Sequence, residues 1–167
     1  VIQNPDALGP AWFVSGIKFE TTPIAVMNSL STFNPKDTAI LFSKDQQMVN
    51  ITPGVDSAAS IQLIKNDNDV ITYRSNSSGN KFAVFSEVFY DRGWKAYVDD
   101  KEVPIIRTNY VLRGISVPAG QHNIKFEFRP SSFYTGEKIA LIAGIIMYLL
   151  LIAAAVQSYR TSRNAKA

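Results

Sequence analysis

The sequence has 167 residues, no cysteine, one histidine and a formal net charge of +3. The lack of cysteine excludes disulfides and thiolate metal sites, and a single histidine excludes a site built on a histidine pair. Arg160, Arg163 and Lys166 account for the whole basic excess, since the other 14 basic and 14 acidic residues cancel. A nucleic-acid-binding domain needs a basic patch on its folded part, so we expect no nucleic-acid partner.

Residues 1–37 are expected to form a lead-in strand and a short helix. The apolar run 11–14 predicts a strand that docks Trp12 or Phe13 into a core. Thr22 can cap a helix and Pro23 suits its first position. Apolar residues then recur at helical spacing and predict the buried face of that helix: Ile24, Met27, Leu30 and Phe33.

Residues 38–130 predict an antiparallel β-sandwich, because short apolar runs recur about every ten residues with turn signals between them. Residues 75–80 read as a loop, and Asp99-Asp100 as a two-residue hairpin loop. The expected strands are 38–42, 46–52, 61–65, 70–74, 81–90, 94–98, 101–104 continued by 105–108, 111–117 and 122–129. The fold class is therefore mainly β, a jelly-roll-like sandwich with one short helix and a C-terminal transmembrane helix.

Residues 139–156 contain no charged or strongly polar side chain. Eighteen residues of helix span about 27 Å, close to the ~30 Å hydrocarbon core of a bilayer. We expect a linker at 131–138, a transmembrane helix at 139–159 and a basic tail at 160–167. The alternatives are a buried core helix and a hairpin of two short strands.

The residues around this run predict its orientation. Phe133, Tyr134 and Tyr159 flank it, as aromatic residues do at membrane interfaces, and the basic tail favours the cytoplasm. Residues 1–138 are then extracytoplasmic. Because the sequence starts at Val1 without a signal-peptide pattern, we expect earlier spans of a longer protein to deliver it; a lone C-terminal anchor is the alternative.

Catalytic motifs such as a P-loop or HExxH are absent from the sequence, so we expect no catalytic residue, cofactor or metal site here. His122 reads as an exposed polar residue beside a turn. The acid pairs Asp67/Asp69 and Asp99/Asp100 favour turn capping over calcium binding.

Four residues around one turn are candidates for substrate binding: Arg107, Asn109, Tyr110 and Arg113. They could contact an anionic headgroup or a sugar acceptor, while an ordinary solvated hairpin is the alternative. Stacking on sugar rings is a second option for four aromatic residues, of which Trp12 and Trp94 fit a core role better: Trp12, Trp94, Tyr97 and Tyr110.

The segment Phe85 to Pro130 reads FSEVFYDRGWKAYVDDKEVPIIRTNYVLRGISVPAGQHNIKFEFRP, and GEKIALIAG follows soon after. With NPDALGPAWFV and FNPKDTAIL earlier in the chain, it resembles the C-terminal part of the YfhO-type bacterial membrane protein family. Asp91-Arg92-Gly93 stands where that family often has Pro-Gly, and Asp100 where it often has Gly. Both differences alter turns.

The resemblance implies a polytopic glycosyltransferase of the GT-C type, in the bacterial inner membrane, that uses polyprenyl-phosphate sugar to modify cell-envelope polymers. Its catalytic acids would lie upstream of Val1, so this sandwich would be an accessory domain. The expected partners are the bilayer, upstream spans of the same protein, and envelope glycan or lipid-linked sugar. Two alternatives are a membrane-anchored glycan-binding module without catalysis and a purely structural brace.

Overall fold

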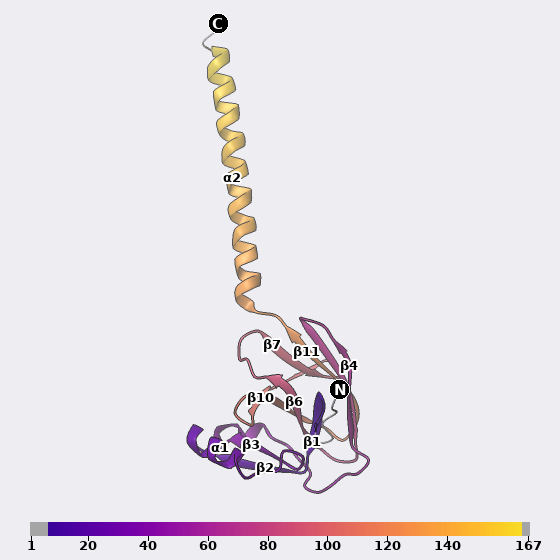
Figure 1. Cartoon of the computed structure of the whole chain (residues 1–167). Helices are drawn as coiled ribbons and strands as arrows, with labels where there is room; N and C mark the ends of the chain where they lie inside the picture. The colour runs from indigo at the N-terminus through magenta and orange to yellow at the C-terminus, as the bar shows by residue number, and fades with distance from the viewer. Residues whose placement is uncertain (1–6, 165–167) are drawn as a thin grey trace, which may run out of the picture. The chain divides into compact units, whose positions relative to one another are not determined.

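The computed structural model describes residues 7–164 and divides the chain after Arg129 into two units. The first unit is a β domain and the second is one long helix, α2 (Figure 1). The predictions for residues 1–6, at the start of the lead-in, and for 165–167, including Lys166 of the basic tail, lie outside the described residues.

The β domain consists of two stacked sheets, which confirms the predicted sandwich. Sheet A has the order β1-β6-β10-β9-β3-β2, and sheet B the order β4-β5-β11-β7-β8. All strand pairs are antiparallel except β2 with β3. The strands are β1 (Ala11–Val14), β2 (Gly16–Glu20), β3 (Thr38–Phe42), β4 (Ser60–Asn66), β5 (Val70–Ser77), β6 (Lys81–Val88), β7 (Trp94–Val98), β8 (Lys101–Val103), β9 (Ile106–Thr108), β10 (Leu112–Val117) and β11 (Gly120–Phe128).

The main core lies between the two sheets. Tyr73 and Phe126 from sheet B meet Phe85 from sheet A, with edge-to-face ring centroids 4.7–6.2 Å apart. Such pairs add about 0.5–1.5 kcal/mol beyond the area they bury. Burial raises the pKa of Tyr73 to about 12, so its phenol is neutral at physiological pH.

A second core covers the other face of sheet A, which explains why both faces of β6 are apolar. Phe82 and Val84 point into it, whereas Phe85 joins the first core. Val49 and Ile51 are two of the half-buried side chains that pack against this core. The strand predicted at 46–52 is wrong: the chain forms the 3-10 helix η1 (Ser43–Met48) and then runs irregularly under sheet A.

Helix α1 (Pro23–Leu30) begins as predicted, since the Thr22 hydroxyl accepts a hydrogen bond from the Ala25 backbone N–H at 3.2 Å. Its predicted buried face is wrong. Ile24 and Met27 are 73% and 52% exposed, whereas Val26 is fully buried.

Both hairpin turns use the left-handed backbone region, which suits Asp and Asn but is unusual for Tyr110. Asp99 and Asp100 have φ of 47° and 67°, and Asn109 and Tyr110 have φ of 47° and 69°. Two consecutive positive φ values define the tight turns that match the twist of antiparallel strands. Between these turns the chain changes sheet, because β8 belongs to sheet B and β9 to sheet A.

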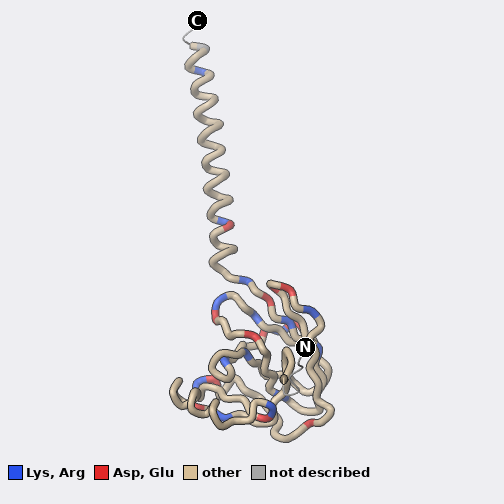
Figure 2. The backbone as a smooth tube through the Cα atoms, in the orientation of Figure 1, with Lys and Arg blue, Asp and Glu red and all other residues tan. Residues whose placement is uncertain are grey.

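Helix α2 (Ser131–Asn164) includes a candidate membrane span, Ser131–Ser162, whose most apolar 18-residue window has mean hydropathy 2.8 and is not buried against the described residues. At 34 residues it is about 51 Å long. Figure 2 shows charged residues near its two ends and none along the run between Lys138 and Arg160. Residues 131–138, predicted as a linker, are helical here.

Candidate functional site

The turn between β9 and β10 separates the four predicted substrate-binding residues into two environments. Arg107 and Tyr110 lie half-buried at the surface. The Arg107 Nε donates a hydrogen bond to the Tyr110 carbonyl oxygen, and its guanidinium lies 4.6 Å from the Tyr110 ring centroid and 5.9 Å from that of Phe42. These contacts hold a cation and an aromatic ring together at one surface point.

Asn109 faces inward and is only 7% exposed. Its N–H donates to the Ile40 carbonyl at 2.9 Å, and its Oδ1 accepts from the Ile40 N–H at 2.8 Å. The Asn109 residue thereby pairs with β3 as another strand would, and it tolerates the positive φ of the turn. In this structure its side chain is used to fix the turn to sheet A.

Arg113 lies between the sheets and is 3% exposed. Its Nη2 is 3.2 Å from a Glu87 carboxylate oxygen, and its guanidinium lies 4.5 Å from the Trp94 ring centroid and 5.0 Å from that of Phe126. Burial lowers the pKa of Arg113, opposed by the nearby Glu87 charge. Its Nε and Nη1 have no hydrogen-bond partner among residues 7–164. Arg107 and Tyr110 are therefore the accessible members of the predicted set.

His122 was predicted to be an exposed polar residue, and this is wrong. Its side chain is 17% exposed, and its Nδ1 lies 2.5 Å from a carboxylate oxygen of Asp99. Its Nε2 lies 3.1 Å from the Ala119 carbonyl oxygen. Each ring nitrogen faces an acceptor oxygen, so the protonated ring can donate to both, and the Asp99 hydrogen bond raises the pKa of His122. Asp99 thus ties the β7–β8 hairpin to His122 and Asn123 of β11.

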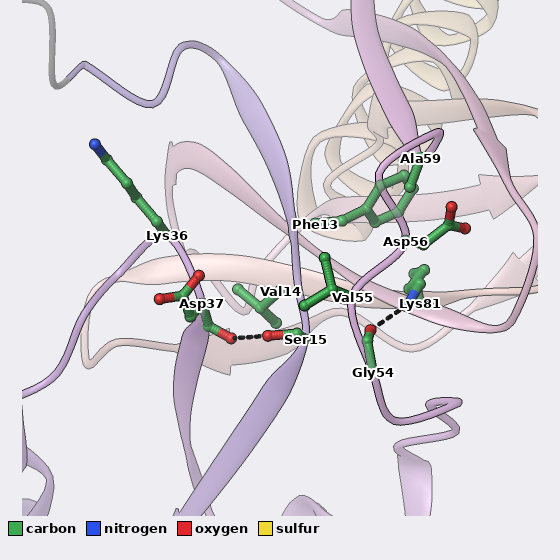
Figure 3. Close-up of a pocket in the computed structure, with 10 residues that line it drawn as sticks. All are labelled: Phe13, Val14, Ser15, Lys36, Asp37, Gly54, Val55, Asp56, Ala59 and Lys81. Carbon is green, nitrogen blue, oxygen red and sulfur yellow. Dashed lines mark hydrogen bonds between the residues drawn. The ribbon is translucent and has the colours of Figure 1, made fainter.

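A small cavity of about 120 Å³ lies where β1, the Gly54–Ala59 loop and the start of β6 meet (Figure 3). Lys81 is 4% exposed there, and its Nζ donates to the Gly54 carbonyl at 2.8 Å. The Asp56 carboxylate accepts from the Ser78 N–H and hydroxyl at 2.7 and 2.6 Å, and these bonds lower the pKa of Asp56. These polar groups hold the loop in place. Ligand pockets usually measure about 300–1,000 Å³, so the cavity is small for a sugar.

The sequence reasoning missed this cavity. The one signal of it in the sequence is Lys81, a charged residue at the start of the long apolar strand β6. Within residues 7–164, no three His, Asp or Glu side chains come close enough to hold a metal ion.

Together these features define a β-sandwich domain joined to a helix that is long and apolar enough to cross a membrane. The chain belongs to the YfhO family, described as "Bacterial membrane protein YfhO", whose model matches residues 36–140. The match runs from the turn before β3 through the sandwich and into the first turns of α2. Searches of the curated proteins and of the solved structures gave no match.

Proposed function

We propose that this chain is the C-terminal accessory domain and membrane span of a polytopic glycosyltransferase of the inner membrane. The enzyme takes sugar from a polyprenyl-phosphate donor and adds it to a cell-envelope polymer. Membership of a bacterial membrane protein family carries the proposal. In it, residues 1–138 are extracytoplasmic and the basic residues after the span stay in the cytoplasm.

The sandwich's role in this scheme is to present acceptor polymer to a catalytic centre located elsewhere in the protein. Arg107 and Tyr110 suit such contact, because a guanidinium binds anionic groups and an aromatic ring packs on a sugar face. Asn109 and Arg113 hold the turn in place instead of touching the acceptor.

The test is made in the full protein in its own bacterium, by measuring envelope-polymer sugars after replacement of the chromosomal gene. Deletion of the gene is expected to remove one sugar modification. Arg107→Ala with Tyr110→Ala should reduce it, and Arg74→Ala, at an exposed position of β5, is the matched control. Unchanged polymer in the deletion strain would refute the glycosyltransferase role. Full modification in the double variant would refute the proposed acceptor contact but not the glycosyltransferase role.

A further inference from the structure

Three exposed side chains form an apolar rim at one end of the sandwich. Val88, Tyr90 and Val111 are 69%, 51% and 50% exposed. They are neighbours, because the Phe89 N–H donates to the Val111 carbonyl at 2.7 Å and Val88 pairs with Leu112 across β6 and β10. We call these three residues the exit rim.

The exit rim belongs to the end of the domain from which the chain leaves for α2. Tyr90 lies in the β6–β7 connection, where the Gly93 carbonyl accepts a hydrogen bond from the Arg129 N–H at 2.6 Å. Arg129 is the last residue of the β domain. The connection that carries Tyr90 is therefore bonded to the point of exit.

The length of chain after Arg129 limits how far this end can be from lipid. Helix α2 starts at Ser131, and its uncharged run starts at Ile139. Eight helical residues cover about 12 Å, and each polar headgroup layer is about 5–8 Å thick. Phe133 and Tyr134, in the first turn of α2, are 65% and 46% exposed, and such rings favour the interface. When α2 crosses a bilayer with its uncharged run in the hydrocarbon core, the covalent link therefore keeps Ser131 within about 12 Å of that core.

We propose that the exit rim inserts into the headgroup region of the bilayer that α2 crosses, and so rests the sandwich on the membrane surface. Valine and tyrosine suit this depth, because their apolar parts enter the acyl boundary while the tyrosine hydroxyl stays in water. A weak contact suffices, since the covalent anchor keeps the local lipid concentration high. A second copy of the chain is a poorer occupant, because a stable interface needs about 20–30 residues a side.

The test uses the full chain in lipid nanodiscs and rests only on α2 crossing the bilayer, not on the glycosyltransferase role. The chain has no cysteine, so a spin label can be placed at single sites by Val88→Cys, Val111→Cys and, in α2, Leu149→Cys. Val55→Cys is the matched control. Val55 is 89% exposed, and its loop is tied to Lys81 at the start of β6, about 23 Å along that strand from Val88.

Collision rates with dissolved oxygen and with a water-soluble nickel chelate report the depth of each label. We expect the oxygen-to-nickel ratio at Val88 and Val111 to lie between those at Leu149 and Val55. Rim labels as accessible to nickel as the Val55 label would overturn the proposal, and a water-exposed Leu149 label would overturn both rim and span. Shielding in discs with two copies but not in discs with one would assign the rim to self-association and also refute it.

A second variant separates lipid contact from local folding. Val88→Asp with Val111→Asp changes only exposed side chains, so the sandwich should fold, as a urea titration can verify. With the label at Tyr90→Cys, this pair should raise nickel accessibility to the Val55 level. The same nickel accessibility with and without the two aspartates would show that apolar insertion does not hold the rim.

Discussion

Gly114, in the middle of β10, offers the sharpest test of how sheet A packs. A Cβ added at this residue would lie 2.5 and 2.6 Å from the Cε1 and Cζ atoms of Phe82 and 2.6 Å from the Thr108 Oγ1. Carbon atoms pack best at about 3.5–4.0 Å, so these neighbours would have to move by about 1 Å. Phe82 and Thr108 are both fully buried and have little room to do so.

Gly114→Ala should therefore lower the free energy of unfolding by about 2–3 kcal/mol, the upper part of the range for overpacked cores. Gly16→Ala in β2 is the matched control. Its nearest atoms, on Asp37 and Thr38, are 3.9 Å from the added Cβ, which is ordinary contact. That variant should be neutral or more stable by up to about 1 kcal/mol, because alanine restricts the unfolded chain.

Urea titration of the full chain in detergent micelles measures both effects. Trp12 and Trp94, the only tryptophans, lie in the sandwich and report its unfolding. Phe82→Leu removes the outer ring atoms that the new methyl would strike. The double variant with Gly114→Ala should thus be more stable than the two separate losses predict. Equal midpoints for Gly114→Ala and Gly16→Ala would refute the packing argument.

Three further predictions use the same titration. Asn109→Ala should lower the free energy of unfolding by about 2–5 kcal/mol, because it leaves the buried Ile40 N–H of β3 unpaired and places alanine at positive φ. Asn109→Gly should cost less, since glycine tolerates that φ, and equal losses for the two variants would exclude backbone strain. Glu87→Gln should cost about 1–3 kcal/mol of stability, less than the loss of a fully buried ion pair, because Glu87 is 33% exposed. Adding Arg113→Met should recover most of that stability, and a further loss in the double variant would contradict the ion-pair argument. Asp99→Asn should cost no more than about 1 kcal/mol, chiefly between about pH 4 and 6.5. The raised pKa of His122 gives stability that is lost as pH rises through the folded-state pKa of His122. The lowered pKa of Asp99 gives stability that is lost as pH falls through the folded-state pKa of Asp99. If Asp99→Asn destabilised the domain just as much above both pKa values, the ion pair would be excluded.

Features set by a few adjacent residues could be predicted from the sequence. The Thr22 cap, the Asp99-Asp100 hairpin and the positive φ of Gly120 depend on local backbone and side-chain preferences. The alternation of apolar and polar residues along β11 is another local pattern, and its apolar side chains Ile124 and Phe126 lie in the core. Such features need no knowledge of which strands meet.

Features set by distant contacts could not be predicted. The alternation in residues 46–52 suits a strand, yet Val49 and Ile51 pack under sheet A from an irregular segment. Arg113 and Asn109 are polar residues at a turn, a pattern that is typical of a solvated hairpin. They are buried because Trp94 and Ile40, from other strands, supply partners that local spacing does not reveal.

The burial of these two polar residues bears directly on function. Asn109 fixes one side of the β9–β10 turn to β3. Arg113, in β10, holds the other side through its contacts with Glu87 and Trp94 between the sheets. The surface residues of the turn, Tyr110 and Val111, are therefore held on a rigid framework and are not carried by a mobile loop. A partner met there, whether acceptor glycan or lipid headgroup, would meet a fixed arrangement of groups. Loosening the turn at Asn109 should then weaken that contact even though Asn109 itself is buried beneath the surface.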